Sequence, residues 1–248
     1  MVVRRLLCTL MFVTACAHHT KGGDDTQADA AFVPDACEGL RCFQVDCEAK
    51  TLPPTTISGI VYAPNGTLPL FGVNVYVPET DPGPLVDGAT CSRCDAGLQG
   101  GAIVQAVTDE TGHFTLADVP ATMNVPVVVQ VGKWRRQLNF QNVAACQDLP
   151  VDVGDTTLPK SMTDMTPNTT SVDMPRIAIS TGNADALECL VRKLGIDDKE
   201  ITSRGQGGRI NLFTDGAAAG KGVSSFKVGF GGGTGGFVDS QDLWNPTS

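Results

Sequence analysis

Basic residues are scarce in this sequence, because 18 Lys and Arg stand against 27 Asp and Glu and leave a formal net charge of −9. Binding to the phosphates of a nucleic acid needs clustered Lys and Arg. The chain has one basic cluster, residues 133–137, in an otherwise acidic sequence. The composition therefore argues against a nucleic-acid partner and fits an acidic exported protein better.

Histidine is also rare, with three in the chain. His18 and His19 lie in a polar leader, where a solvated spacer explains them better than a metal site does. His113 is the only histidine in a segment that we expect to fold, so no Ser-His-Asp or Cys-His arrangement can be assembled, and no pair of carboxylates has suitable surroundings. The sequence predicts no catalytic residues, no metal and no cofactor.

No apolar run near the N-terminus is long enough to cross a bilayer, which takes roughly 20 residues. Residues 1–15 instead have the layout of a signal peptide, with Arg4 and Arg5 before a short apolar run. The "VTAC" ending resembles a bacterial lipobox, which implies lipidation of Cys16 and a cell-envelope protein anchored to a membrane by lipid. An ordinary cleaved signal is the alternative, and both export the chain. Because Ala17 follows the cysteine, we expect the outer membrane.

Export changes the meaning of the cysteines, since oxidising compartments favour disulfides. A zinc site would need two matched cysteine pairs, and the sequence has one such pair, "CSRC". The number of cysteines after Cys16 is seven, which is odd, so at least one thiol stays free or pairs with another chain. The seven candidate disulfide residues after Cys16 are Cys37, Cys42, Cys47, Cys91, Cys94, Cys146 and Cys189.

Composition divides the mature chain into four parts. Residues 16–54 are a small, polar tether with a cysteine-rich end that we expect to pin it to the next domain. Residues 55–146 hold short segments rich in Val, Ile and aromatics with period-two alternation, separated by turn residues, which predicts a β-sandwich. Residues 147–174 are rich in Thr, Asp and Pro and are predicted to be an extended, solvated linker. Residues 175–248 form the last part.

The stretch "TDETGHFTLADVP" could be mistaken for a catalytic loop, because Asp109, Glu110 and His113 lie close together in it. Asp109 suits the first position of a turn, and Gly112 suits a position with positive φ. Phe114 begins an inward alternation along the next strand. We therefore predict the tip of a β-hairpin, with His113 exposed at the start of the returning strand.

These residues also carry a family resemblance. "ISGIVYAPNGTLPLFGVNVYVP" (57–78), followed by "AIVQAVTDETGHFTLADVP" (102–120), resembles the carboxypeptidase regulatory-like domain, a transthyretin-like seven-stranded sandwich. The resemblance covers residues 55–140, and it implies a non-catalytic module for binding or scaffolding. The insert at residues 79–101 departs from the family pattern. The whole chain is similar to predicted lipoproteins of myxobacteria that carry this module.

The basic cluster offers candidate ligand contacts in Lys133, Trp134, Arg135 and Arg136. Trp134 could stack on a sugar while an arginine pairs with an anionic glycan or lipid headgroup. The favoured alternative is the edge of a hairpin, where charges discourage the addition of another strand. Alternation places Arg135 on the opposite face from Trp134 and Arg136.

The last part predicts a strand, a helix and a second strand. "GNADALECLVRKLG" has an N-cap at Asn183, an end at Gly195, and an apolar face formed by Leu187, Leu190, Val191 and Leu194. Cys189 lies off this face, and Cys146 is its favoured partner. "GAAAGKG" and "GGGTGG" fail as nucleotide-binding motifs through spacing and context. One helix cannot cover both faces of a sheet, so we expect an incomplete α/β unit: either the chain is truncated, or this segment docks on the sandwich or on a partner.

The fold expected from the sequence is thus mainly β, a transthyretin-like β-sandwich followed by a small, incomplete α/β segment. Two functions remain. The favoured one is an envelope lipoprotein whose sandwich binds a glycan or a protein partner without catalysis. The alternative is the front half of an exported α/β enzyme, which a longer reading frame in the source DNA would support.

Overall fold

A computed structural model describes residues 37–88, 97–180, 187–202, 205–214 and 238–239. The described part is mainly β, with twelve strands in three sheets and only short helices. The predicted β-sandwich is confirmed: two of the sheets pack around one apolar core, and the third belongs to the C-terminal segment.

The smaller sheet of the sandwich has the order β4-β1-β7. Its strands are β1 (Thr56–Ile60), β4 (His113–Leu116) and β7 (Asp148–Pro150). β4 runs antiparallel to β1 and β7 runs parallel to it. Inward residues alternate along β4, where Phe114 and Leu116 are buried between exposed neighbours, as the period-two pattern predicts.

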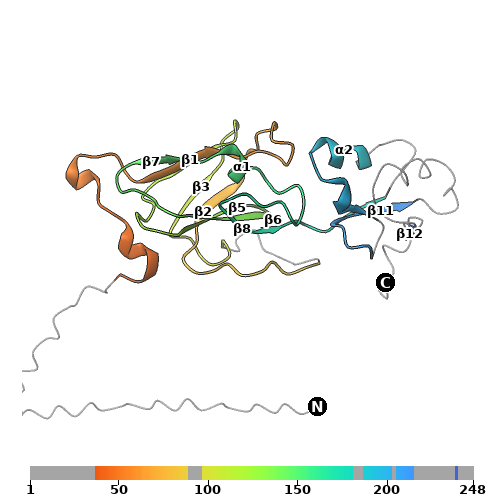
Figure 1. Cartoon of the computed structure of the whole chain (residues 1–248), viewed down its shortest axis with the longest axis horizontal. Helices are drawn as coiled ribbons and strands as arrows, with labels where there is room; N and C mark the ends of the chain where they lie inside the picture. Colours follow the sequence, from red (N-terminus) through yellow and green to blue (C-terminus); the bar gives the residue numbers. More distant parts are fainter. Residues whose placement is uncertain (1–36, 89–96, 181–186, 203–204, 215–237, 240–248) are drawn as a thin grey trace, which may run out of the picture. The chain divides into compact units, whose positions relative to one another are not determined.

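The larger sheet has the order β3-β2-β5-β6-β8 and is antiparallel throughout. Its strands are β2 (Asn74–Val77), β3 (Val104–Val107), β5 (Val125–Val131), β6 (Trp134–Phe140) and β8 (Thr169–Asp173). Figure 1 shows β1 and β7 as a separate layer beside the layer of β2, β5, β6 and β8. Val127, Val129 and Leu138 line the inner face of this sheet and pack against Ile57 and Leu116 of the other.

The prediction of a solvated linker at residues 147–174 was wrong. The segment contributes β7, the short helix α1 (Val153–Thr156) and β8, and it contains the buried residues Leu158 and Val172. β8 pairs with β6 along its length, so β6 is an interior strand and not the edge that its charges suggested. Residues 147–174 thus complete the sandwich although few of their side chains are apolar.

The cysteine-rich region before the sandwich is attached to it, as expected. It contains η1 (Gly39–Phe43) and η2 (Glu48–Lys50). A disulfide joins Cys37 to Cys42 around η1, and a second joins Cys47 to Cys146. Cys47 is buried, and Thr55 accepts a hydrogen bond from the backbone N–H of Cys146 through its hydroxyl oxygen at 2.9 Å. The second disulfide therefore fixes the chain before β1 to the segment between β6 and β7.

The described parts of the insert, residues 79–88 and 97–101, lie over the outer face of the larger sheet. The two ends of the insert meet where the Thr80 N–H donates to the Gly100 carbonyl at 3.0 Å. Tyr76 of β2 points outward beneath the insert, is fully buried, and donates its hydroxyl to the Gln99 carbonyl at 3.1 Å. Burial raises the pKa of the Tyr76 hydroxyl, although the nearby Arg135 opposes this. The insert is thus a third layer over part of the sandwich.

The C-terminal segment has the predicted strand, helix and strand. β9 (Ile177–Ser180), α2 (Leu187–Lys193), η3 (Asp198–Glu200), β10 (Ile201–Thr202), β11 (Ile210–Thr214) and β12 (Val238–Asp239) make it up. β9, β10 and β12 all run parallel to β11. The helix ends where Gly195 has φ +90°, as expected, while the proposed cap Asn183 lies outside the described residues.

The predicted apolar face of α2 is only half buried. Val191 packs into the core of this segment, but Leu187 is 53% exposed and Leu190 is 50% exposed. The segment packs instead through the strands, with Ile201, Ile210 and Leu212 fully buried. Its core also touches Trp134 and Met162, which belong to the sandwich and to the stretch before β8.

Polar contacts join the C-terminal segment to the sandwich as well. The buried Glu200 carboxylate accepts the Met162 N–H at 2.9 Å, and the Lys160 carbonyl accepts the Asp197 N–H at 3.0 Å. Asn65 donates its side-chain amide to the Lys193 carbonyl at 3.1 Å. A Cβ at Gly195 would lie 2.4 Å from the Asn65 backbone nitrogen, so only glycine fits there. These contacts agree with the expectation that the C-terminal segment docks on the sandwich or on a partner.

Candidate functional site

The stretch around His113 is a turn, as predicted, but not the tip of a hairpin. β3 and β4 on its two sides belong to different sheets, so the turn carries the chain from one layer to the other. The Asp109 carboxylate accepts hydrogen bonds from the Thr111 N–H, the Thr111 hydroxyl and the His113 N–H at 2.7 to 3.0 Å. Gly112 has φ +78°, and a Cβ there would lie 2.8 Å from the Val61 carbonyl oxygen.

These contacts explain why acidic side chains stand in the turn. The Thr111 hydroxyl, followed by the backbone N–H groups of His113 and Thr111, holds the pKa of Asp109 below its ordinary value. Asp109 is thus kept charged as an acceptor for the turn. His113 is exposed at the start of β4, as the sequence indicates. The group is a structural turn and offers no general base poised for a substrate.

The interpretation of Arg135 and Arg136 as ligand contacts was wrong, because both side chains are 1% exposed. Arg135 lies on the outer face of β6, under the insert. Its guanidinium donates to Asp173 Oδ2 at 2.8 Å, to the Gly83 carbonyl at 2.7 Å and to Gln99 Oε1 at 3.1 Å. Arg135 therefore ties β8 and both halves of the insert to the sheet.

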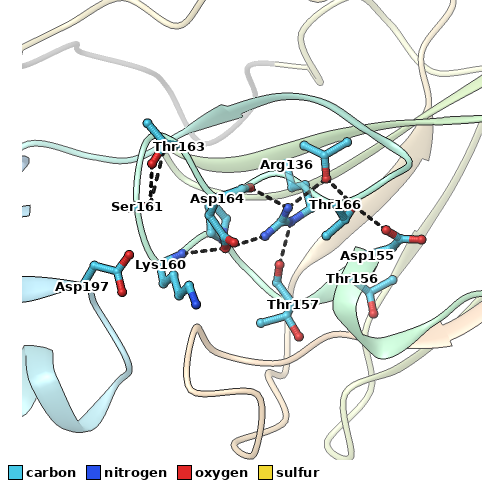
Figure 2. A network of polar contacts seen from close by, with 12 residues as sticks. Arg136, Asp155, Thr156, Thr157, Lys160, Ser161, Thr163, Asp164, Thr166 and Asp197 are labelled. Carbon is cyan, nitrogen blue, oxygen red and sulfur yellow. Dashed lines mark hydrogen bonds and ion pairs between the residues drawn. The ribbon is translucent and has the colours of Figure 1, made fainter.

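Arg136 does the same on the opposite face, as strand alternation requires. Its guanidinium donates to the Thr157 carbonyl, the Asp164 carbonyl, Thr169 Oγ1 and Asp164 Oδ2, all at 2.8 to 2.9 Å. Figure 2 shows the guanidinium surrounded by the loop between α1 and β8. Asp155 continues this polar layer through hydrogen bonds from Thr166 and from Asn168. Both guanidinium groups therefore stabilise the fold through hydrogen bonds to other parts of the chain.

Trp134 and Lys133 also have structural partners. The Trp134 indole N–H donates to the Pro159 carbonyl at 2.8 Å, and its ring packs against both apolar cores. Lys133 Nζ donates to the backbone carbonyls of Val86 at 2.8 Å and of Gly88. Arg135 and Arg136 are thus buried, while Lys133 and Trp134 are part exposed and each donate to backbone carbonyls of the chain.

A charged pocket of about 440 Å³ lies between the insert and the start of β9. Asp87 receives hydrogen bonds there from Arg209 at 2.8 Å and Arg176 at 3.3 Å. Arg209, and then Arg176, lower the pKa of the Asp87 carboxyl. Both guanidinium groups of this pocket therefore already have Asp87 as a partner within the chain. Sequence reasoning did not find it, since its charges come from distant segments.

A second pocket, which we call the sheet-face pocket, lies on the outer face of the larger sheet and has a volume of about 360 Å³. Residues 126–128 of β5, residues 137–139 of β6 and Thr170 of β8 form its floor. Leu40 of η1 and residues 78–82 of the insert form its walls. Sequence reasoning missed this pocket too, because it depends on the path of η1 and the insert over the sheet.

The cysteine predictions are partly answered. Cys37, Cys42, Cys47 and Cys146 form the two disulfides described above. Cys189 has a free thiol, so its favoured pairing with Cys146 was wrong, and Cys146 is buried in another bond. Cys91 and Cys94 lie outside the described residues.

Other predictions also fall outside the described ranges. These are the lipidation site Cys16, His18 and His19 of the leader, and the motifs at residues 216–222 and 231–236. In the part of the chain that is described, no three His, Cys, Asp or Glu side chains gather where they could hold a metal ion. No helix within the same ranges is long and apolar enough to cross a membrane.

Comparison with known proteins finds a distant similarity to solved structures. No protein-family model matches the chain, and no curated protein matches it. The described fold is similar to a chain from a complex of a type II cohesin with an X-dockerin from Acetivibrio cellulolyticus, at 18% identity and a TM-score of 0.30. That similarity covers 58% of this chain and 85% of the other.

Proposed function

We propose that the chain is a bacterial cell-envelope lipoprotein, anchored in the outer membrane by acyl chains on Cys16. Its sandwich, which resembles the carboxypeptidase regulatory-like domain, serves as a non-catalytic module for binding or scaffolding. The membrane is the first partner, through the lipid, and a glycan or a protein ligand is the second.

The observation that carries this proposal is the Cys47–Cys146 disulfide. Structural disulfides persist in oxidising compartments outside the cytoplasm, and both cysteines of this bond are buried. A second disulfide lies in the cysteine-rich end of the tether. Both bonds fit the signal-like layout of residues 1–15, which ends in "VTAC".

A binding role is supported by how the polar side chains are used. Asp109 holds a turn, and Arg135 and Arg136 each hold a covering segment to the sheet. The sheet-face pocket, in contrast, is open and has strands β5, β6 and β8 as its floor. Pockets with apolar walls and a few polar groups are the usual form of a ligand site.

The anchor is tested by replacing Cys16 with Ser in the full chain expressed in a bacterium. We expect the protein to partition with outer membranes and Cys16→Ser to release it, because several acyl chains provide most of the membrane affinity, at about 0.8 kcal/mol per buried methylene. Mass spectrometry of the mature N-terminus reports the modification directly. Cys37→Ser is the control, and it should remain with the membrane.

The anchor proposal fails if the mature N-terminus carries no acyl chains, or if Cys16→Ser fractionates as the unaltered protein does. An N-terminus cut elsewhere and free of lipid would indicate the ordinary secretory signal instead. Neither result would bear on whether the sandwich binds a ligand.

The alternative function is an exported α/β enzyme. One observation favours it: β9, β10, β11 and β12 pair in parallel, which is the arrangement of α/β enzymes. In such sheets the ligand binds beyond the carboxyl ends of the strands. Turnover that depends on the segment after Thr214 would favour this alternative over a binding module.

A further inference from the structure

The sheet-face pocket has walls that are held in place before any ligand arrives. η1 is closed by the Cys37–Cys42 disulfide, and Arg41 beside it donates to Glu79 Oε1 of the insert at 2.9 Å. The end of η1 is fixed to the sandwich, where the Ala121 N–H donates to the Phe43 carbonyl at 2.8 Å. Binding to such a preformed site loses little conformational entropy.

The lining combines apolar and polar residues and contains no aromatic ring. Its apolar members include Leu40, Val128 and three prolines, at positions 78, 82 and 126. Sugar rings are commonly recognised by stacking on aromatic side chains, whereas a branched aliphatic group packs well against Leu, Val and Pro. The lining therefore fits an aliphatic side chain better than a sugar.

Two polar groups of the pocket are acceptors that lack a full set of donors. Asn139 lines the pocket, and its Oδ1 is buried without a hydrogen-bond partner, the one such side-chain atom in the described part of the chain. Asp81 accepts one hydrogen bond, from the Gly83 N–H at 2.9 Å, and pairs with no cation among the described residues. The Thr170 hydroxyl donates to the Gln137 carbonyl. A ligand that donates hydrogen bonds is therefore favoured, and an anionic ligand is repelled by Asp81.

We propose that the sheet-face pocket binds a peptide segment, with one aliphatic side chain in the pocket and an N–H donor directed to Asn139. This inference rests on the proposed binding function and names its ligand class. A ligand N–H that reaches Asn139 Oδ1 supplies the partner that the protein does not. Asp81 favours a neutral or positively charged segment over an acidic one.

The probes are L-leucinamide and N-acetyl-L-leucine, which share the side chain but differ in charge and donors. They are titrated into the full chain carrying Cys16→Ser, and backbone amide signals are followed by NMR. We expect L-leucinamide to cause saturable shifts at Val128, Gln137 and Asn139. N-acetyl-L-leucine should bind about tenfold more weakly, a difference that corresponds to ~1.4 kcal/mol.

Asn139→Leu tests the acceptor. It removes the amide and keeps the size of the side chain, so we expect loss of saturable binding with no lower denaturation midpoint. Gln105→Leu makes the same kind of change at an exposed position of β3, away from the pocket, and should bind L-leucinamide as the parent does. The midpoint separates a loss of the site from a loss of the fold.

Three results overturn the inference: no saturable shift at the pocket, equal binding of the two probes, or unchanged binding in Asn139→Leu. Saturable shifts of the same amides with N-acetylglucosamine, in place of L-leucinamide, would replace the peptide by a glycan. All of these leave the membrane anchor untouched, because that is decided by fractionation and mass spectrometry. Failure here is therefore distinguishable from failure of the envelope proposal.

Discussion

The Arg136 side chain brings a positive charge into the interior, where four oxygen acceptors surround it. Only one of them, Asp164 Oδ2, belongs to a charged group. Desolvation of a guanidinium is costly, and a complete set of hydrogen bonds is what offsets that cost. Removing the side chain would leave the Thr157 and Asp164 carbonyls without their donor.

We therefore expect Arg136→Met to lower the free energy of unfolding by about 3 kcal/mol, the lower end of the range for breaking a buried pair. Urea denaturation followed by circular dichroism measures this. Arg41→Met is the matched control, since the Arg41–Glu79 pair is about half exposed. Its denaturation midpoint should stay near that of the parent, because exposed pairs are screened by solvent. Equal midpoints for the two variants would contradict the buried role of Arg136.

At the residue scale, the sequence predicts what is decided locally. The turn at Asp109 was found because its donors are two and four residues away. The partners of Arg135 and Arg136 could not be found, because Gly83, Asp164 and Asp173 are brought to β6 only by the folded chain. A pair of adjacent arginines on a strand carries no signal that says whether other segments will cover it.

At the scale of elements, the two disulfides close loops of very different size. Cys47 and Cys146 are 99 residues apart, whereas Cys37 and Cys42 are 5 apart. A cross-link restricts the unfolded chain more when its loop is longer. We therefore expect loss of the Cys47–Cys146 bond to lower the free energy of unfolding by about 4–5 kcal/mol, and loss of the Cys37–Cys42 bond to lower it by about 2 kcal/mol. The double variants Cys47→Ala with Cys146→Ala, and Cys37→Ala with Cys42→Ala, test this by denaturant unfolding.

Each double variant serves as the other's control, since both remove two cysteines. A larger loss for the Cys37–Cys42 variant would mean that η1 matters more to the fold than the closure of the sandwich does. Mass spectrometry under non-reducing conditions checks that the remaining bond is intact.

The strands that the sequence predicts are those with repeated apolar residues. β8 was missed because its five residues, "TTSVD", bury only Thr169 and Val172 and so resemble a polar linker. The hairpin error has a different cause. The same turn residues suit a strand that pairs within one sheet and a strand that crosses to the other sheet. Turn chemistry therefore predicts the turn, but it does not predict that β3 pairs with β2 and β4 with β1.

At the scale of the whole molecule, the C-terminal segment shares its core with residues outside it. Trp134 touches both apolar cores, and Met162 and Met174 join the second. Glu200 is buried, and its carboxylate is satisfied by the Met162 N–H and by the Arg209 N–H at 3.3 Å. Without the sandwich, Glu200 would lose one of these donors and the core would lose apolar contacts at once.

We therefore expect residues 176–248, produced alone, to show no cooperative thermal transition and to exchange the amides of Ile210 to Phe213 rapidly. The same amides should be protected in the full chain, because there β11 lies between β9 and β10 and packs against a completed core. Hydrogen exchange followed by mass spectrometry makes the comparison. Residues 37–174 alone are the companion sample, and they should still fold, at a lower midpoint, because Trp134 and Met162 lose their cover. A sharp melt of residues 176–248, with slow exchange in β11, would show instead that this segment is a domain in its own right and would direct the search for function to it.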